Sequence, residues 1–153
     1  VKVNLMVRGA CSLIPGVRGL SDNIKVLSVV DRFLEHSRIY YFGDSQRMYL
    51  SSADWMPRNF FSRLEIAFPI LDERLRRFIR DVVIPIYLAD TVKARELTPQ
   101  GTWRKRSAAS IRPLLGTLNL PAPVRAQSCF EELAKRRYQD TPLCREQHFP
   151  QNP

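Results

Sequence analysis

The sequence predicts an α/β domain followed by an irregular, basic and proline-rich tail. Two hydrophobic periods indicate the α/β class: apolar and polar residues alternate over residues 1–8, whereas apolar residues recur with helical spacing over residues 71–86. A change of composition marks the tail, because 7 of the 11 prolines fall from Pro99 onward. We therefore expect a folded domain over residues 1–98 and a tail over residues 99–153.

The strands are expected at residues that alternate or are β-prone. Residues 23–30 predict a second strand after an irregular loop that contains glycine and proline. Residues 38–42 and 48–52 are short β-prone runs, and the Gly-Asp-Ser turn at residues 43–45 predicts that they form a hairpin. Alternation returns over residues 64–70 and predicts another strand.

A helix is expected after these strands, with Asp72 as its N-cap. Pro85 should kink or end this helix, because its ring cannot be accommodated in a regular helix interior. A second, short amphipathic helix is expected in the tail near residues 124–138. The apolar face of the first helix comprises Leu71, Leu75, Phe78, Ile79, Val82 and Ile86.

The chain is strongly basic, with 24 Lys and Arg residues against 15 Asp and Glu, a formal net charge of +9 and a pI near 10.0. Arginine supplies 19 of the basic residues and lysine only 5. Because a guanidinium group presents a planar fork of donors that fits phosphate or carboxylate oxygens, this skew predicts an anionic ligand. Residues 102–153 carry +5 of the charge, and the preceding part carries +4.

Length and composition exclude several classes of protein. With 44% hydrophobic and 25% charged residues, the chain is not a coiled coil, a collagen or a wholly disordered tail. The apolar run at residues 82–89 is far shorter than the ~20 residues that cross a bilayer, and the first residues lack a secretory signal. Cys11, Cys129 and Cys144 form neither an even disulfide set nor a Cys-x-x-Cys pair, which favours a reducing cytoplasm without a zinc site. The chain begins at Val1, so we expect a piece of a longer polypeptide.

Several residues are candidates for chemistry, and each also has a structural interpretation. His36 could be a surface or hydrogen-bonded structural residue, and Arg8 could be a solvated residue at a strand edge or a ligand group where a loop begins. The polar residues 51–54, followed by Arg58 and Asn59, could form only a turn, with Trp55 anchoring it in the core. His148 lies in the proline-rich terminus and is expected to be inert.

Together, five segments within residues 3–97 resemble the C-terminal catalytic domain of bacterial polyphosphate kinase. That family reversibly moves the terminal phosphate of ATP onto a polyphosphate chain. Each segment is weakly specific, but the five occur in order and at compatible spacings. They are Val-Arg-Gly-Ala-Cys-Ser-Leu at 7–13, Leu-Ser-Asp-Asn-Ile at 20–24, Phe-Leu-Glu-His-Ser-Arg-Ile-Tyr at 33–40, Tyr-Leu-Ser-Ser-Ala-Asp-Trp-Met-Pro-Arg-Asn at 49–59 and Asp-Thr-Val-Lys-Ala at 90–94.

The resemblance implies a phospholipase D-like fold, with a mixed β-sheet flanked by helices. In such folds a His-x-Lys motif lies near the end of a strand, and residues 36–38 occupy that place with the sequence His-Ser-Arg. Residues 51–54 resemble the Ser-x-Asn element that follows. In this family two such domains face each other around a tunnel, and the histidine that becomes phosphorylated belongs to the preceding domain, which this chain lacks.

The family pattern also implies roles for individual residues. Arg8 and His36 would bind the nucleotide phosphates, with His36 as the catalytic residue. Arg38, Arg58 and Ser52 are weaker candidates for binding the polyanion. Magnesium would be held mainly by the missing domain, so no metal ligand is assigned in this chain. The implied partners are ATP or ADP, polyphosphate, upstream domains of the same polypeptide and further copies of it, without specific nucleic acid, in the cytoplasm or at the inner face of the membrane.

Two other functions stay open at this point. A phospholipase D-like nuclease or phosphodiesterase half-site would use His36 as its nucleophile, but such enzymes carry lysine where this chain has Arg38. A basic nucleic-acid-binding module is suggested by charge alone, and saturable nucleotide binding would distinguish it from a kinase. The sequence departs from the family pattern in a short hairpin at residues 42–49, in Phe61 where relatives carry an acidic residue, and in its long tail.

Overall fold

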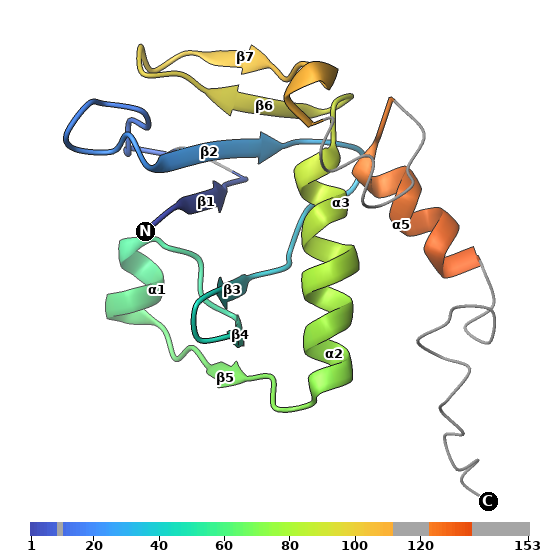
Figure 1. The fold of residues 1–153 in the computed structure, drawn as a ribbon. Coiled ribbons are helices and arrows are strands. Elements are labelled where there is room, and N and C mark those ends of the chain that lie inside the picture. Colours follow the sequence, from blue (N-terminus) through green and yellow to red (C-terminus); the bar gives the residue numbers. More distant parts are fainter. Residues whose placement is uncertain (9–10, 112–122, 136–153) are drawn as a thin grey trace, which may run out of the picture. The chain divides into compact units, whose positions relative to one another are not determined.

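The computed structural model consists of two compact units, each of which is described by itself (Figure 1). Unit 1 combines residues 1–35 with the chain from residue 85 onward, and unit 2 is the continuous stretch 36–84. Cys144 and His148 lie outside the described residues. The structure describes residues 1–8, 11–111 and 123–135.

Unit 1 contains a four-stranded mixed sheet with the strand order β1-β2-β6-β7. Strand β1 (Val3–Met6) runs parallel to β2 (Ile24–Val29), with Val3 opposite Ile24. Strand β6 (Ala94–Leu97) pairs antiparallel with β2 and with β7 (Trp103–Lys105). Both pairing directions therefore occur in one sheet, which confirms the predicted mixed α/β class.

The burial of the first two strands follows from their places in the sheet. Along β1, Val3 and Leu5 are half-buried while Asn4 and Met6 are exposed, as the period of two predicts for an edge strand. Strand β2 lies inside the sheet, and its last four residues are all buried. The backbone amide of Val7 donates to a β2 carbonyl at 2.8 Å and extends the pairing to the end of β1.

The core of unit 1 combines the end of helix α3 (Ile84–Ala89) with residues far along the chain. Ala89, Ile111 and Val124 are fully buried and contact one another, and Cys129 packs against them. Tyr87 of α3 and Phe130 of helix α5 (Ala126–Lys135) bring their ring centroids to 4.9 Å. The backbone amide of Thr91 donates to the Val124 carbonyl at 2.9 Å, so the α5 segment is tied to α3 and its following turn.

The described part of the segment after residue 98 differs from the expected irregular tail. It contributes β7, the 3-10 turn η2 (Ala108–Ile111) and α5, which lies within the helix expected near residues 124–138. The physical reason is that scattered apolar residues such as Ile111 are buried individually in the core without following a period of their own. The division of the chain at residue 98 stays a prediction.

Unit 2 contains a three-stranded antiparallel sheet with the order β3-β4-β5. Strands β3 (Ile39–Phe42) and β4 (Arg47–Ser51) form the predicted hairpin, and the turn carries Gln46 in the left-handed region with φ 55°. Strand β5 (Ala67–Pro69) is a short exposed edge. Met48, Ala53 and Ile70 form the buried apolar part of this unit, with Met48 only 1% exposed.

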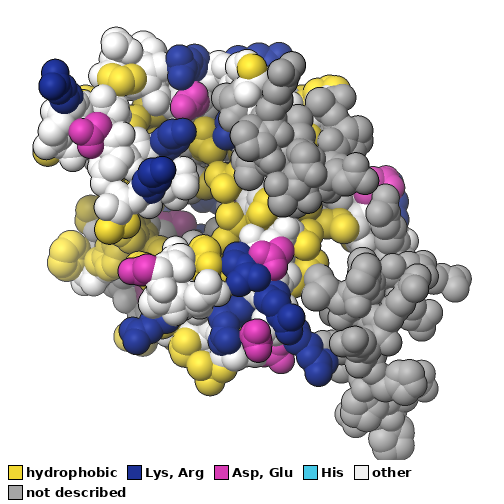
Figure 2. Space-filling model, in the orientation of Figure 1, with side chains coloured by type: hydrophobic (Ala, Val, Ile, Leu, Met, Phe, Trp, Pro, Cys, Tyr) yellow, Lys and Arg dark blue, Asp and Glu magenta, His cyan; other side chains and the backbone are white. Residues whose placement is uncertain are grey.

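Helix α1 (Pro57–Ser62) occupies a segment in which the sequence indicated only a polar turn. Pro57 stands at the first helical position, where its missing N–H removes no intrahelical hydrogen bond. Hydrophobic side chains are exposed over α1, while Lys and Arg side chains gather over α2 (Glu73–Phe78) (Figure 2). In α1 the exposed residues include Phe60 and Phe61.

The long helical segment begins as predicted but does not end at Pro85. Asp72 caps α2 and accepts hydrogen bonds from the amides of Arg74 and Leu75 at 2.8 and 3.0 Å. A π-helical turn, η1 (Ile79–Val83), follows, and α3 continues through Pro85. Wider i→i+5 bonding before the proline relaxes the clash of its ring with the preceding turn, so helical structure continues to Ala89.

The extra residue in the π-turn also explains why the predicted apolar face is not uniformly buried. It shifts the phase of the side chains, so residues before and after η1 do not share one face. Ile86 of α3 is 3% exposed, whereas Leu75 of α2 is 53% exposed. Leu71, which is 79% exposed, lies before the N-cap Asp72 and is not part of the helix. Among the described residues, no helix is long and apolar enough to cross a membrane.

Candidate functional site

Arg8 lies directly after β1 in unit 1 and is exposed. Its Nη1 donates a hydrogen bond of 2.8 Å to the backbone carbonyl of Glu35. Within the described part of the chain, its Nε and Nη2 make no hydrogen bond or ion pair. The guanidinium group is therefore held at one nitrogen while its other donors are available to an anion.

The Glu35 side chain, also in unit 1, is held by two donors from distant parts of the sequence. The Tyr87 hydroxyl donates to Oε2 at 2.5 Å, and Gln127 Nε2 donates to Oε1 at 2.8 Å. The backbone carbonyl and both carboxylate oxygens of Glu35 are therefore all hydrogen-bonded. This residue immediately precedes the predicted catalytic histidine in the chain.

His36 is the first residue of unit 2 and is exposed. The structure shows no hydrogen bond to its ring from any described residue. Its backbone carbonyl accepts a hydrogen bond of 2.7 Å from Arg38 Nη1. Arg38 also directs Nε and Nη2 to Asp54 Oδ1, at 3.0 and 2.9 Å. The guanidinium group of Arg38 thus joins the start of β3 to the segment after β4, and all three of its nitrogens are already used.

Ser52 belongs to a second polar cluster of unit 2, with Glu65 and Asn59. Its hydroxyl donates a hydrogen bond to Glu65 Oε2 and accepts one from the Ile66 amide at 3.1 Å. Asn59 Nδ2 donates to Glu65 Oε1 at 2.6 Å. The hydrogen bonds from Ser52 and Asn59 stabilise the ionised carboxylate and lower the pKa of Glu65. The hydroxyl of Ser52 therefore connects β4 to the segment that enters β5.

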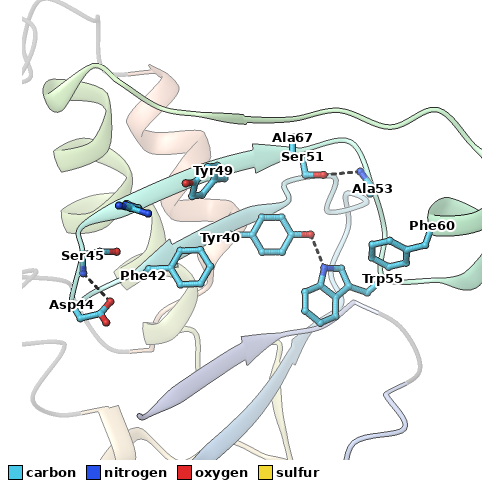
Figure 3. Close-up of a pocket in the computed structure, with 11 residues that line it drawn as sticks. Tyr40, Phe42, Asp44, Ser45, Tyr49, Ser51, Ala53, Trp55, Phe60 and Ala67 are labelled. Carbon is cyan, nitrogen blue, oxygen red and sulfur yellow. Dashed lines mark hydrogen bonds between the residues drawn. The ribbon is translucent and has the colours of Figure 1, made fainter.

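Trp55 is 76% exposed, so the expectation that it anchors a turn in the core is wrong. Its indole N–H donates to the Tyr40 hydroxyl at 2.7 Å, and its ring stacks on Tyr40 and meets the edge of Phe60 (Figure 3). The indole N–H thus has a hydrogen-bond acceptor, and the ring has aromatic contacts, although the side chain lies at the surface. Arg58, the remaining weak candidate, is exposed on α1.

An open hollow of about 630 Å³ lies on the sheet of unit 2. Its wall is mainly aromatic, with Tyr40, Phe42, Tyr49, Trp55 and Phe60 around it (Figure 3). None of the residues predicted to bind phosphate lines it. The hollow therefore lies on a different surface from the one that the charged and titratable residues indicate.

A magnesium site is not supported by the side chains that the structure describes. Within residues 1–8, 11–111 and 123–135, no group of three or more His, Cys, Asp or Glu residues is arranged to hold a metal ion. The described carboxylates that lie near these candidates are instead hydrogen-bonded to protein donors, as Glu35, Asp54 and Glu65 show.

Comparison with known proteins places this arrangement in a family. Residues 1–114 match the family model described as polyphosphate kinase C-terminal domain 2. The chain belongs to this family. It is 51% identical over 133 residues to polyphosphate kinase from Klebsiella pneumoniae, and 48% identical over 132 residues to polyphosphate kinase from Escherichia coli K12. Each match covers 79% of this chain and 19% of the relative.

A solved structure of the same kind supports the fold. The crystal structure of polyphosphate kinase from Porphyromonas gingivalis matches 88% of this chain with a TM-score of 0.73 and 38% sequence identity. The match covers 19% of that chain. The chain thus spans about a fifth of the length of the polyphosphate kinases that it matches. The resemblance inferred from the five sequence segments is confirmed.

The sequence indicated Arg8 and His36 as candidates. It did not indicate the residues that form hydrogen bonds within the same two units. Asp54, Glu65 and Gln127 make the contacts that a phosphate-binding prediction had no reason to include. Asp90 is completely buried. Its place in the sequence, directly after the apolar end of a helix, was a signal that its carboxylate has a structural role. Gln127 lies in the short amphipathic helix expected near residues 124–138, and that expectation did not indicate its contacts.

Proposed function

We propose that this chain is the part of a polyphosphate kinase that binds nucleotide and polyphosphate phosphates. The reaction transfers the terminal phosphoryl group of ATP to a polyphosphate chain and is reversible. The observation that carries this proposal is the family match over residues 1–114, together with relatives near 50% identity that are polyphosphate kinases.

In this proposal the phosphoryl group reaches polyphosphate through a phosphohistidine in an upstream domain. The bond between the γ-phosphorus and the β,γ-bridging oxygen breaks, ADP leaves, and a P–N bond to that histidine forms. Attack by a terminal polyphosphate oxygen then breaks the P–N bond and lengthens the chain by one phosphate. This chain contributes binding and charge stabilisation, which are the main demands of phosphoryl transfer.

Arg8 and His36 are proposed to meet those demands. Arg8 keeps two guanidinium nitrogens available among the described contacts and can pair with two phosphate oxygens. His36 is exposed, and an imidazole N–H can donate to a phosphate oxygen. Arg58 is a further, exposed candidate for binding the polyanion.

The contacts of the two weaker candidates Arg38 and Ser52 make them less available to polyphosphate. Arg38 is already bonded to Asp54 and to the His36 carbonyl, and Ser52 is bonded to Glu65, so polyphosphate would have to compete with these partners. Arg38 also stands where a phospholipase D-like hydrolase would present lysine. Its engagement with Asp54 gives no support to the hydrolase alternative.

The wider features of the proposal concern the complete polypeptide. Magnesium is proposed to be bound outside the described residues, which lack a suitable ligand cluster, and no step is assigned to it here. Upstream domains and further copies of the polypeptide are the proposed protein partners. The proposed compartment is the cytoplasm, including the inner face of the membrane.

The test is phosphate transfer by the complete protein compared with the isolated chain. With ATP labelled in its terminal phosphate, the complete protein should make labelled, acid-insoluble polyphosphate and should regenerate ATP from polyphosphate and ADP. The isolated chain should do neither, because the phosphorylated histidine lies upstream. Absence of transfer by the folded complete protein would contradict the proposed function, and turnover by the isolated chain would contradict the assignment of the phosphohistidine.

A further inference from the structure

One side chain of helix α5 is hydrogen-bonded to the segment before His36. The amide of Gln127, which is 7% exposed, accepts a hydrogen bond from the Phe33 N–H at 2.9 Å and donates to the Phe33 carbonyl at 2.8 Å. Its Nε2 also donates to Glu35 Oε1 at 2.8 Å. The side chain thus pairs with the backbone of Phe33 as a neighbouring strand would, although the two residues are 94 positions apart.

The start of α5 is itself anchored inside unit 1. The buried carboxylate of Asp90 accepts from the Ala126 amide at 2.7 Å through Oδ2, and from the amides of Lys93 and Ala94 at 2.7 and 2.9 Å through Oδ1. One side chain therefore joins the end of α3 to the first residue of α5. This fixed support makes Gln127 a rigid contact and not a mobile surface group.

A second contact holds the same segment next to Gln127. Arg125 directs Nε and Nη2 to the two carboxylate oxygens of Asp31, at 2.8 and 2.6 Å. The Asp31 side chain is only 1% exposed and that of Arg125 is 39% exposed, so a buried carboxylate is held in a bidentate pair by a partly exposed guanidinium group. Residues 31–35 are thereby bound at both ends, at Asp31 by Arg125 and at Glu35 by Gln127.

We propose that Gln127 is a positioning residue for Arg8 and that it acts through Glu35. The path is continuous within unit 1: Gln127 holds Phe33 and Glu35, and the Glu35 carbonyl accepts the 2.8 Å hydrogen bond from Arg8 Nη1. This inference rests on the proposed role of Arg8 in binding phosphate. It assigns a function to α5, which corresponds to the short helix expected within the tail.

The physical reason is preorganisation. A free arginine side chain populates many rotamers, and ordering it when phosphate binds reduces affinity. A carbonyl held in one place orders the guanidinium group before the ligand arrives, and leaves Nε and Nη2 for phosphate oxygens. Without Gln127, the carbonyl of Glu35 would no longer be held in place. The Arg8 side chain would then lose conformational entropy when phosphate binds, which would weaken binding.

The experiment is a double-mutant cycle in the complete protein, with the KM for ATP as its main readout. Gln127→Ala should raise this KM by about tenfold, the upper range expected from losing an ordering hydrogen bond. In an Arg8→Ala background the same substitution should change the KM by less than about twofold, because its effect passes through Arg8. Glu132→Ala, at an exposed position of α5, is the matched control and should change neither value.

A structural role would give a different pattern. If Gln127 only stabilised the fold, Gln127→Ala would lower kcat and the melting temperature, leave the KM unchanged, and act equally in both backgrounds. Either an unchanged KM or additive effects would overturn the inference. If the complete protein transfers no phosphate, the proposed function fails instead, and the cycle can then be measured as nucleotide binding with ADP as the probe.

A second pair of variants covers the case in which Gln127→Ala does not fold. Gln127→Glu keeps an acceptor for the Phe33 amide but places a carboxylate against that of Glu35, so it should raise the KM for ATP. Adding Glu35→Gln restores a donor and an acceptor across this contact and should recover at least half of the loss on a logarithmic scale. No recovery, with both proteins folded, would contradict the path through Glu35.

Discussion

The two units differ in how far apart along the sequence their contacting polar residues lie. Unit 2 is one continuous stretch, and its polar clusters join residues close in sequence: Arg38 and Asp54 are 16 positions apart, and Ser52 and Glu65 are 13 apart. In unit 1 the segment before His36 is bound by residues 94 positions away. Proximity along the chain is therefore enough to assemble the hairpin region of unit 2, whereas the surroundings of Arg8 exist only when distant parts of unit 1 are packed.

This difference suggests how each unit responds to change. Contacts between distant segments must offset a larger loop-closure entropy, so they depend on a core that holds the segments together. In unit 1 that core includes Ile111 and Val124, which come from the segment predicted to be a tail. Substitutions in that segment should therefore lower the stability of unit 1 more than expected for an irregular tail.

The largest effect is expected from the two proposed phosphate-binding residues, one in each unit. Arg8→Ala and His36→Ala should each lower the kcat/KM of the complete protein for ATP by about 100-fold or more, because each removes a group that stabilises transferring charge. Steady-state assays of polyphosphate synthesis measure this loss. Arg18→Ala, an exposed arginine elsewhere in unit 1, should have little effect. Near-normal turnover of either variant would remove that residue from the site.

The next effect tests whether the core of unit 1 extends beyond residue 98. Ile111 is 0% exposed, so Ile111→Ala should lower the free energy of unfolding by about 2–5 kcal/mol through lost burial and a residual cavity. Urea denaturation followed by circular dichroism measures the change. The control is Leu20→Ala, since Leu20 is 79% exposed in the same unit. Equal, small changes in both variants would show that the segment is a tail after all.

A smaller, pH-dependent effect is expected from Asp31. Hydrogen bonding to Arg125 lowers the pKa of Asp31 below its ordinary value of 3.8. A lowered folded pKa means that the ionised carboxylate stabilises the fold above pH 3.8, and that this contribution is lost as the pH falls through the lowered pKa. Asp31→Asn should lower the melting temperature by about 5 °C at pH 7.

The pH series decides whether this effect comes from the charge. The difference in melting temperature between the parent protein and Asp31→Asn should be constant from pH 7 to pH 5, and should shrink below pH 3.8. Asp22→Asn, at an exposed position of unit 1, is the control. A difference that persists unchanged in acid would assign the stabilisation to the shape of the side chain and not to its ionisation.

The smallest effect is expected at Trp55, despite its size. Because Trp55 is 76% exposed and contacts mainly Tyr40 and Phe60, Trp55→Ala should change the free energy of unfolding by no more than about 1 kcal/mol. Met48→Ala in the same unit should cost about 2–5 kcal/mol, since Met48 is 1% exposed. Reversal of this order in urea denaturation would place Trp55 in the core, as its sequence context suggested.

Local patterns predicted several of the strands. Alternation indicated β1, whose half-buried and exposed residues follow a period of two, whereas β2 is buried over its last four residues and the hairpin at 38–52 was predicted from β-prone runs and a turn. Strands β6 and β7 were missed, since their pairing partners and not their own periodicity make them strands. The length of the helix through Pro85 was also missed, because a π-turn accommodates the proline.

For the candidate site, the sequence alone was sufficient to identify the family, because residue type and order carry that information. The roles of Arg8 and His36 stay predictions. The sequence did not reveal that Arg38 is paired with Asp54, or that Gln127 binds the segment before His36. Those partners are chosen by distance in space, and a hydrogen bond between residues 94 positions apart leaves no local pattern to detect. The chemical groups could be identified from the sequence, whereas packing alone decided which of them are hydrogen-bonded to other residues.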